Sequence, residues 1–152
     1  MQAVHVDHSD TDVATVLIEL QRRAYEVEAA LIGSRAIPPL TETLEELRGS
    51  SETFLAVFVE GVIVGVVSYR VFGGTIDIHR LAVDPTCFRA GIGATLVRAA
   101  LAAEPSATRA IVQTGADNDP ARSLYLREGF EQTDELEVAP GVRVARYRKR
   151  LR

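Results

Sequence analysis

The segment from Arg89 to Ala94 contains Gly91 and Gly93 and could bind an anion through its backbone. It lies between an apolar, β-branched stretch that ends at Val83 and a helical pattern that begins with the glycines. A turn from a strand into a helix leaves backbone N–H groups unpaired at the positive end of the helix dipole, and glycines let an anion approach them. The same glycines could instead allow close packing of the helix on the strand. The residue types therefore indicate a phosphate cradle without identifying its ligand.

Two common phosphate-binding motifs do not fit this loop. The dinucleotide-binding motif requires a third glycine three residues after Gly93, where this chain has Leu96. The nucleoside-triphosphate loop requires a Gly-Lys-Ser/Thr sequence, which is absent. A redox or kinase-like nucleotide enzyme is therefore disfavoured.

The composition is typical of a single soluble globular domain, which we expect to cover residues 1–152. The chain is 47% hydrophobic and 25% charged, and its formal net charge of −4 provides no positive field for nucleic acid or an anionic membrane. No apolar run approaches the roughly 18 residues of a spanning helix, and the first residues do not resemble a signal peptide. We therefore expect a cytoplasmic protein with neither a nucleic-acid nor a membrane partner.

Cysteine and histidine usage argues against a metal cofactor. Cys87 is the single cysteine, so neither an intramolecular disulfide framework nor a thiolate metal cluster can form. The three histidines show no metal-ligand spacing with carboxylates or thiols. We expect no metal and a reducing compartment.

The periodicity of apolar residues predicts the elements that must position the glycine loop. A period of three to four residues indicates helices, and a period of two with β-branched residues indicates strands. In chain order we expect a strand over 2–6, helices over 13–31 and 41–49, strands over 52–60, 62–72 and 75–83, a helix over 91–104, a strand over 109–115, a helix over 119–129 capped by Asp119, and a hairpin over 134–151. This order predicts an α+β fold: a mixed, mostly antiparallel central sheet of about six to seven strands flanked by about four helices.

Two segments resemble the signature segments of the GCN5-related N-acetyltransferase (GNAT) superfamily. The sequence "LAVDPTCFRAGIGATLV" (81–97) is similar to the strand, loop and helix that hold the diphosphate of coenzyme A (CoA) in that family. The sequence "NDPARSLYLREGF" (118–130) is similar to its N-x-x-A-x-x-L-Y-x-x-x-G-F segment. The match departs at Phe88, where the family has Arg or Gln, and Arg89 follows one residue later. The resemblance implies the acyl-CoA N-acyltransferase fold and acetyl-CoA as cosubstrate.

The same resemblance assigns residues to the cosubstrate. It implies that the fourth strand of the sheet splays from the fifth at a bulge, and that the pantetheine arm of CoA pairs with backbone groups in the gap. The backbone N–H near Val83 would then stabilise negative charge on the acetyl carbonyl oxygen. The residues implied in cosubstrate binding are Leu81, Ala82, Val83, Phe88, Arg89, Ala90, Gly91, Ile92, Gly93, Ala94, Asn118 and Arg122.

Acetyl transfer to an amine needs a proton donor and a proton acceptor. By the resemblance, Tyr125 is the general acid near the sulfur; core packing is the alternative explanation for this aromatic residue. Asp77 and His79 lie two residues apart on one predicted strand and so share a face. Some family members use a carboxylate at the place of Asp77 as the base, whereas histidine titrates closer to neutral pH. A solvated strand face is the alternative for both.

The acceptor should bind opposite the thioester. Gln21, Tyr25 and Glu28 follow helical spacing beside the apolar stripe, and together with "IGSRAIPPL" (32–40) they are the candidate acceptor site. A solvated helix edge is the alternative. We expect direct transfer, in a ternary complex, to a primary amine of a small molecule or peptide. A non-catalytic acyl-CoA-binding sensor or scaffold module of the same fold stays open, as does a homodimer.

Overall fold

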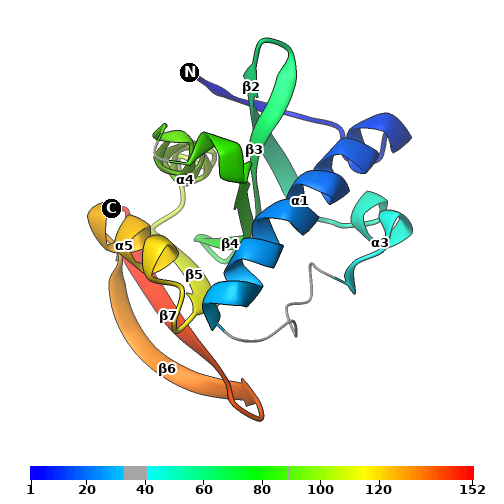
Figure 1. Ribbon diagram of the computed structural model, residues 1–152. Helices are drawn as coiled ribbons and strands as arrows, with labels where there is room; N and C mark the ends of the chain where they lie inside the picture. Colours follow the sequence, from blue (N-terminus) through cyan, green and yellow to red (C-terminus); the bar gives the residue numbers. More distant parts are fainter. Residues whose placement is uncertain (33–40, 89) are drawn as a thin grey trace.

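The computed structural model describes residues 1–32, 41–88 and 90–152, which form one sheet with helices on both faces (Figure 1). The seven strands follow the order β1-β2-β3-β4-β5-β7-β6, and every pair is antiparallel except β4 with β5. The strands are β1 (Ala3–His5), β2 (Thr53–Val59), β3 (Val62–Phe72), β4 (Thr75–Val83), β5 (Arg109–Gly115), β6 (Glu131–Ala139) and β7 (Val142–Arg150). The helices are α1 (Thr11–Ile32), α3 (Leu44–Arg48), α4 (Ile92–Ala102) and α5 (Asp119–Arg127), with a 3₁₀ turn η1 (Pro85–Cys87). The predicted fold class is confirmed.

Each face of the sheet has its own hydrophobic core. Helix α1 runs across one face, where Leu17 and Leu20 pack with Phe54, Val66 and Ala82 of the sheet (Figure 1). Helices α4 and α5 contribute to the second core on the opposite face; its largest members include Leu96, Ile76, Tyr125 and Tyr147. Among the described residues, no helix is long and apolar enough to cross a membrane.

Strand β4 pairs with β5 over a short length only. The parallel pairing covers Thr75–Asp77 against Arg109–Ile111, after which the two strands separate. Beyond that point β4 still pairs with β3 and β5 with β7, so the sheet opens between its two central strands. The splay expected from the resemblance is present.

A β-bulge at His79 interrupts the pairing of β4 with β3. Ser68 pairs with Arg80 and Tyr69 with Ile78, which leaves His79 as the extra residue. The extra residue reverses the alternation of side chains along β4. Ile76 and Ile78 therefore face the α4 side before the bulge, and Leu81 and Val83 face it afterwards.

Two helix ends differ from or refine the sequence prediction. Asp119 was expected to cap α5, but the cap is Asn118, whose side chain accepts from the Ala121 N–H. The reason is positional, because Asp119 and the proline after it already occupy the first turn. Helix α3 is shorter than predicted and begins with a capping box in which Thr43 and Glu46 bond each other's backbone N–H.

Gly65 of β3 marks a close approach of α4 to the sheet. A Cβ atom at this position would lie 2.6 Å from Ile92 Cγ2 and 2.9 Å from Leu96 Cδ1, both buried. We therefore expect Gly65→Ala to lower the free energy of unfolding by about 1–3 kcal/mol, measured by urea denaturation. Gly49→Ala is the control, because its Cβ would lie in ordinary contact, 3.4 Å from the Glu45 carbonyl oxygen, at a φ of −86°. Equal stability of the two variants would contradict this reading of the α4 contact.

Candidate active site

The N-terminus of α4 presents backbone N–H groups that no described side chain caps. Gly91 stands at the N-cap with a φ of 78°, a left-handed conformation that favours glycine. The first helical bond runs from the Thr95 N–H to the Gly91 carbonyl, so the N–H groups of 92–94 have no partner within the helix. A Cβ on Gly93 would lie 3.1 Å from Leu124 Cδ2 and 4.0 Å from Val83 Cγ2. Gly93 thus keeps the helix start close to both α5 and β4, and amides without a partner in the helix suit a diphosphate.

The backbone of β4 points into the gap at two residues. The Asp84 N–H donates to the Val64 carbonyl oxygen at 2.8 Å. Because inward and outward N–H groups alternate in an antiparallel pair, Leu81 and Val83 direct theirs away from β3, toward β5. The Leu81 N–H donates to the hydroxyl of Tyr25 on α1. The upper part of β4 therefore offers backbone donors on the open side of the sheet.

The β5 side of the gap has an equivalent donor. The Ala116 N–H bonds the Arg143 carbonyl of the β6–β7 hairpin, so the same alternation turns the Gly115 N–H away from β7 and into the gap. That N–H and the side chain of Asn118 both donate to the carboxylate of Glu28 on α1. Residues of α1 thus bond both sides of the gap.

Tyr25, Glu28, Asn118 and Tyr125 meet at this gap, and we call them the gap cluster. Burial raises the pKa of Glu28, although its two hydrogen bonds act in the opposite direction. Burial, and then the charge of Glu28, raise the pKa of both tyrosines. The Tyr125 ring is held by edge contact with Phe130, at 5.7 Å between ring centres. The cluster therefore combines one carboxylate with two buried, protonated phenols.

Asp77 and His79 lie together on β4, at a different place from the gap cluster. The Nε2 atom of His79 is 3.1 Å from Oδ2 of Asp77, and its Nδ1 atom is 3.6 Å from Oε2 of Glu52. The imidazole of His79 therefore lies between two carboxylates, with one near each ring nitrogen. The expected proximity of Asp77 and His79 is present, whereas their catalytic role stays a prediction.

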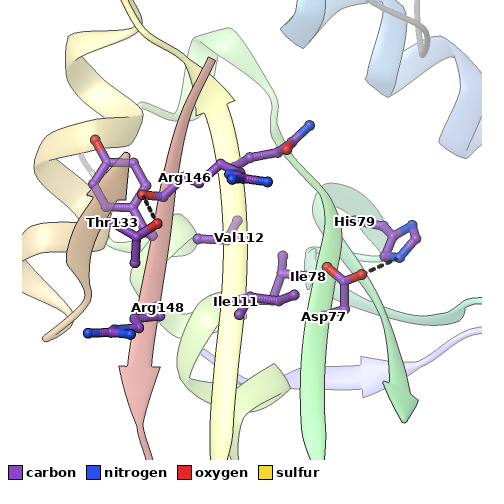
Figure 2. A pocket seen from close by; sticks show the side chains of 10 residues that line it. Asp77, Ile78, His79, Ile111, Val112, Thr133, Arg146 and Arg148 are labelled. Atoms are coloured by element: carbon purple, nitrogen blue, oxygen red, sulfur yellow. Dashed lines mark hydrogen bonds and ion pairs between the residues drawn. The ribbon is translucent and has the colours of Figure 1, made fainter. Parts of the chain in front are cut away.

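A cavity of about 460 Å³ adjoins Asp77 and His79. Figure 2 shows these two side chains on β4 at one side of the cavity and Arg148 of β7 at the other, with Ile111 between them. The Nε atom of Arg148 is bonded to Glu131, and Arg146 is bonded through two nitrogens to Asp134. The remaining lining residues are Ile78, Val112, Gln113, Thr133 and Tyr147. The cavity has an apolar floor with charged walls of both signs.

Sequence reasoning missed a buried arginine beside the bulge. Arg80 is 8% exposed, and its guanidinium bonds Glu42 at 2.6 Å, Glu52 at 2.8 Å and Gln21 at 2.8 Å. Gln21, a predicted acceptor contact, is fully buried and also donates to Glu42. The amide of Gln21 therefore bonds Arg80 and Glu42 within the protein. An arginine within an apolar strand is a signal of a buried ion pair, but the chain positions of its partners have no characteristic spacing.

The other predicted cosubstrate residues have varied surroundings. Phe88 is 51% exposed at the loop. Arg122 of α5 turns toward the last hairpin, where it donates to the Tyr147 hydroxyl at 3.0 Å and to Gln132 at 2.9 Å. Arg89 and residues 33–40 of the predicted acceptor loop lie outside the described residues. The roles of all these residues stay predictions.

Comparison with known proteins gives a family and one curated relative. Residues 15–130 match the model of the acetyltransferase (GNAT) family. UPF0157 protein YqkA of Bacillus subtilis is 32% identical over 137 residues, which cover 90% of this chain and 40% of that protein. The chain therefore spans less than half the length of the curated relative it matches.

Solved structures share the fold over nearly the whole chain. The PaiA N-acetyltransferase from Thermoplasma acidophilum, solved in complex with coenzyme A, has a TM-score of 0.78 at 17% identity and covers 99% of this chain and 100% of its own. The ribosomal-protein-S18-alanine N-acetyltransferase from Escherichia coli has a TM-score of 0.75 at 15% identity and covers 98% of this chain and 92% of its own. The smu.2055 protein of Streptococcus mutans UA159 has a TM-score of 0.80 at 19% identity and covers 99% of both chains. At these identities the likeness concerns the fold.

The ion pairs of Arg80 should make stability depend on pH. Burial would raise the pKa of Glu52, but hydrogen bonds from Arg80 and Ser68 outweigh it and lower the pKa to about 2. Ionised Glu52 therefore stabilises the protein above its unfolded pKa near 4.5, and this contribution is lost as the pH falls from about 4.5 to 2. We expect Glu52→Gln to cost about 2–3 kcal/mol at pH 7, and the difference from wild type to shrink below pH 4.5.

Urea denaturation at a series of pH values from 3 to 7 measures this difference. Glu19→Gln, on the exposed face of α1, is the control and should stay within about 0.5 kcal/mol of wild type throughout. A constant difference in the free energy of unfolding between Glu52→Gln and wild type across the series would show that the negative charge of Glu52 does not stabilise the protein.

Proposed function

The chain belongs to the acetyltransferase (GNAT) family, and on that premise we propose that residues 1–152 form one catalytic domain that transfers an acetyl group from acetyl-CoA to a primary amine. The acceptor is a small molecule or a peptide, and transfer is direct within a ternary complex. The observation that carries the proposal is the adjacency of the uncapped α4 start, the open β4–β5 gap and Tyr125.

The cosubstrate fits the described residues in two places. The amides of 92–94 would bind its diphosphate, because no side chain caps the helix start and Gly91 and Gly93 carry no side chain of their own there. The N–H of Val83 would bond it within the gap, where it has no strand partner on the β5 side. When bound, acetyl-CoA supplies an activated acetyl thioester. Arg89 would add charge at the diphosphate, whereas the guanidinium of Arg122 is bonded to Tyr147, Ala116 and Gln132 in the described structure.

Tyr125 would donate a proton to the departing sulfur. Its ring is 3% exposed and lies between Phe130 and Tyr147, so the hydroxyl has a defined position. Its raised pKa keeps the phenol protonated in the free protein. The raised pKa makes the phenol a weak acid, so its proton would move to sulfur only as negative charge develops there in the transition state.

The acceptor would approach from the α1 side of the sheet. The cavity beside Asp77 and His79 opens between β4, β5 and β7, and its acidic wall would suit a cationic amine (Figure 2). Tyr25 and Glu28 lie at the gap itself. The proposed acceptor contacts are therefore Asp77, His79, Tyr25 and Glu28.

A thiol-release assay with a panel of amines tests the activity. We expect CoA release from acetyl-CoA that depends on one class of amine, and an increase in melting temperature with CoA but not with NAD or ATP. CoA binding without CoA release on any amine would instead support a non-catalytic acyl-CoA-binding module. Protection by NAD or ATP alone would exclude the proposed cosubstrate.

Tyr125→Phe tests the proton donor. Phenylalanine keeps the contacts with Phe130 and Tyr147 and removes the hydroxyl, so we expect kcat to fall about 100-fold while the KM for acetyl-CoA stays within about threefold. Tyr69→Phe is the matched control, because Tyr69 is another buried phenol on the same face of the sheet and lies outside the gap cluster. Equal kcat values for wild type and Tyr125→Phe would remove Tyr125 from the chemistry.

A further inference from the structure

Glu28 is the acidic side chain of the gap cluster. Its carboxylate accepts hydrogen bonds from the Gly115 N–H on β5 and from the side chain of Asn118 at the start of α5. Within the described residues, it is the carboxylate whose charge raises the pKa of both Tyr25 and Tyr125. Glu28 is therefore bonded to the β5 side of the gap and to the start of α5, the helix that carries Tyr125.

Direct transfer constrains where the proton acceptor can lie. The attacking nitrogen and the departing sulfur bond to the same acetyl carbon, with reacting atoms about 3–3.5 Å apart on approach. The group that deprotonates the nitrogen must therefore lie near the group that protonates the sulfur. With Tyr125 as the donor at sulfur, the acceptor of the nitrogen's proton belongs beside the gap cluster.

Asp77 and His79 meet this constraint less well than Glu28. Asp77 lies at the last β4–β5 pair, opposite Ile111, and therefore before the strands separate. His79 is held between the carboxylates of Asp77 and Glu52, and Glu52 is in turn bonded to Arg80. Both side chains thus belong to the ion-pair cluster on the α1 face of β4.

We propose that Glu28, rather than Asp77 or His79, accepts the proton from the acceptor nitrogen, and that it returns this proton to Tyr125. The proposal rests on the proposed acetyl transfer and adds the residue that acts as base. It assigns to α1 a chemical role in addition to acceptor contact.

The proton and electron balance closes within the pair. The acceptor reacts as a neutral amine, after losing one proton to solvent. Its lone pair forms the N–C bond, and the C–S bond breaks with its electron pair on sulfur. The nitrogen's proton goes to the Glu28 carboxylate, directly or through a water molecule, and the Tyr125 hydroxyl proton goes to sulfur. Glu28 then returns its proton to the Tyr125 phenolate, directly or through a water molecule, so both side chains regain their starting states.

Glu28→Gln separates this role from a structural one. A glutamine side-chain oxygen can still accept from the Gly115 N–H and from Asn118, but it cannot take up a proton. We expect kcat to fall about 100-fold or more, with the KM for acetyl-CoA within about threefold. Glu19→Gln, on the exposed face of the same helix, is the control and should keep wild-type kcat. Unchanged kcat in Glu28→Gln, with a 100-fold loss in Asp77→Asn, would overturn the proposal and identify Asp77 as the base.

A second measurement does not depend on turnover. In protein with ¹³C-labelled glutamate side chains, the Glu28 carboxyl signal is assigned by its loss in Glu28→Gln. We expect its titration midpoint to lie above the ordinary value of 4.5, and saturating CoA to shift the signal. A midpoint at or below 4.5 with no response to CoA would overturn the proposal.

Comparing the activities of wild type and Glu28→Gln distinguishes the failure of this proposal from the failure of the proposed function. Wild-type protein that acetylates no amine in the panel contradicts the acetyltransferase activity. Active wild-type protein with equally active Glu28→Gln contradicts the role of Glu28 alone.

Discussion

The separation of β4 from β5 is the constraint on which the rest of the structure depends. Two central strands that stop pairing leave backbone N–H groups directed into the sheet's interior, and such groups are costly when buried without a partner. Helix α1 meets this requirement on both sides of the opening. Tyr25 accepts from Leu81 on β4, and Glu28 accepts from Gly115 on β5. Tyr25 and Glu28 of α1 therefore satisfy backbone N–H groups on both sides of the β4–β5 gap.

The bulge at His79 determines which side chains of β4 pack into each hydrophobic core beyond the point where β4 leaves β5. Without the extra residue, the positions after it would exchange faces, and the side chains of Leu81 and Val83 would leave the α4 core. The bulge also directs Arg80 to the α1 face, where Glu42, Glu52 and Gln21 surround its guanidinium. This cluster links β4 to the residue before β2, to α1 and to the segment before α3. Beyond the point where β4 leaves β5, its pairing with β3 and the bonds of Arg80 thus hold β4 in place.

Much of the fold follows from local sequence, because periodicity and turn residues are local properties. The strands Val62–Phe72, Thr75–Val83 and Arg109–Gly115 have the predicted bounds. The bulge itself has a signal in the sequence, since apolar residues occur at 76 and 78 and then at 81 and 83, which breaks the period of two. The partners of Arg80 could not be predicted, because they come from three distant parts of the chain and an ion pair imposes no spacing on a sequence. For the same reason Gln21 and Glu28, one stripe of α1 in the sequence, have different surroundings in the structure.

These different surroundings explain why one helix can both fix the sheet and take part in chemistry. Gln21 lies where α1 covers paired strands, and its amide is used by Arg80 and Glu42. Glu28 lies further along the helix, over the opening, where its partners are a backbone N–H and an amide, with no cation bonded to it in the described part of the chain. A carboxylate paired with arginine has a lowered proton affinity, as at Glu52, whereas burial without a cation raises it. The different positions of these carboxylates relative to Arg80 therefore distinguish Glu42 and Glu52, which hold β4 in place, from Glu28, which has the higher proton affinity.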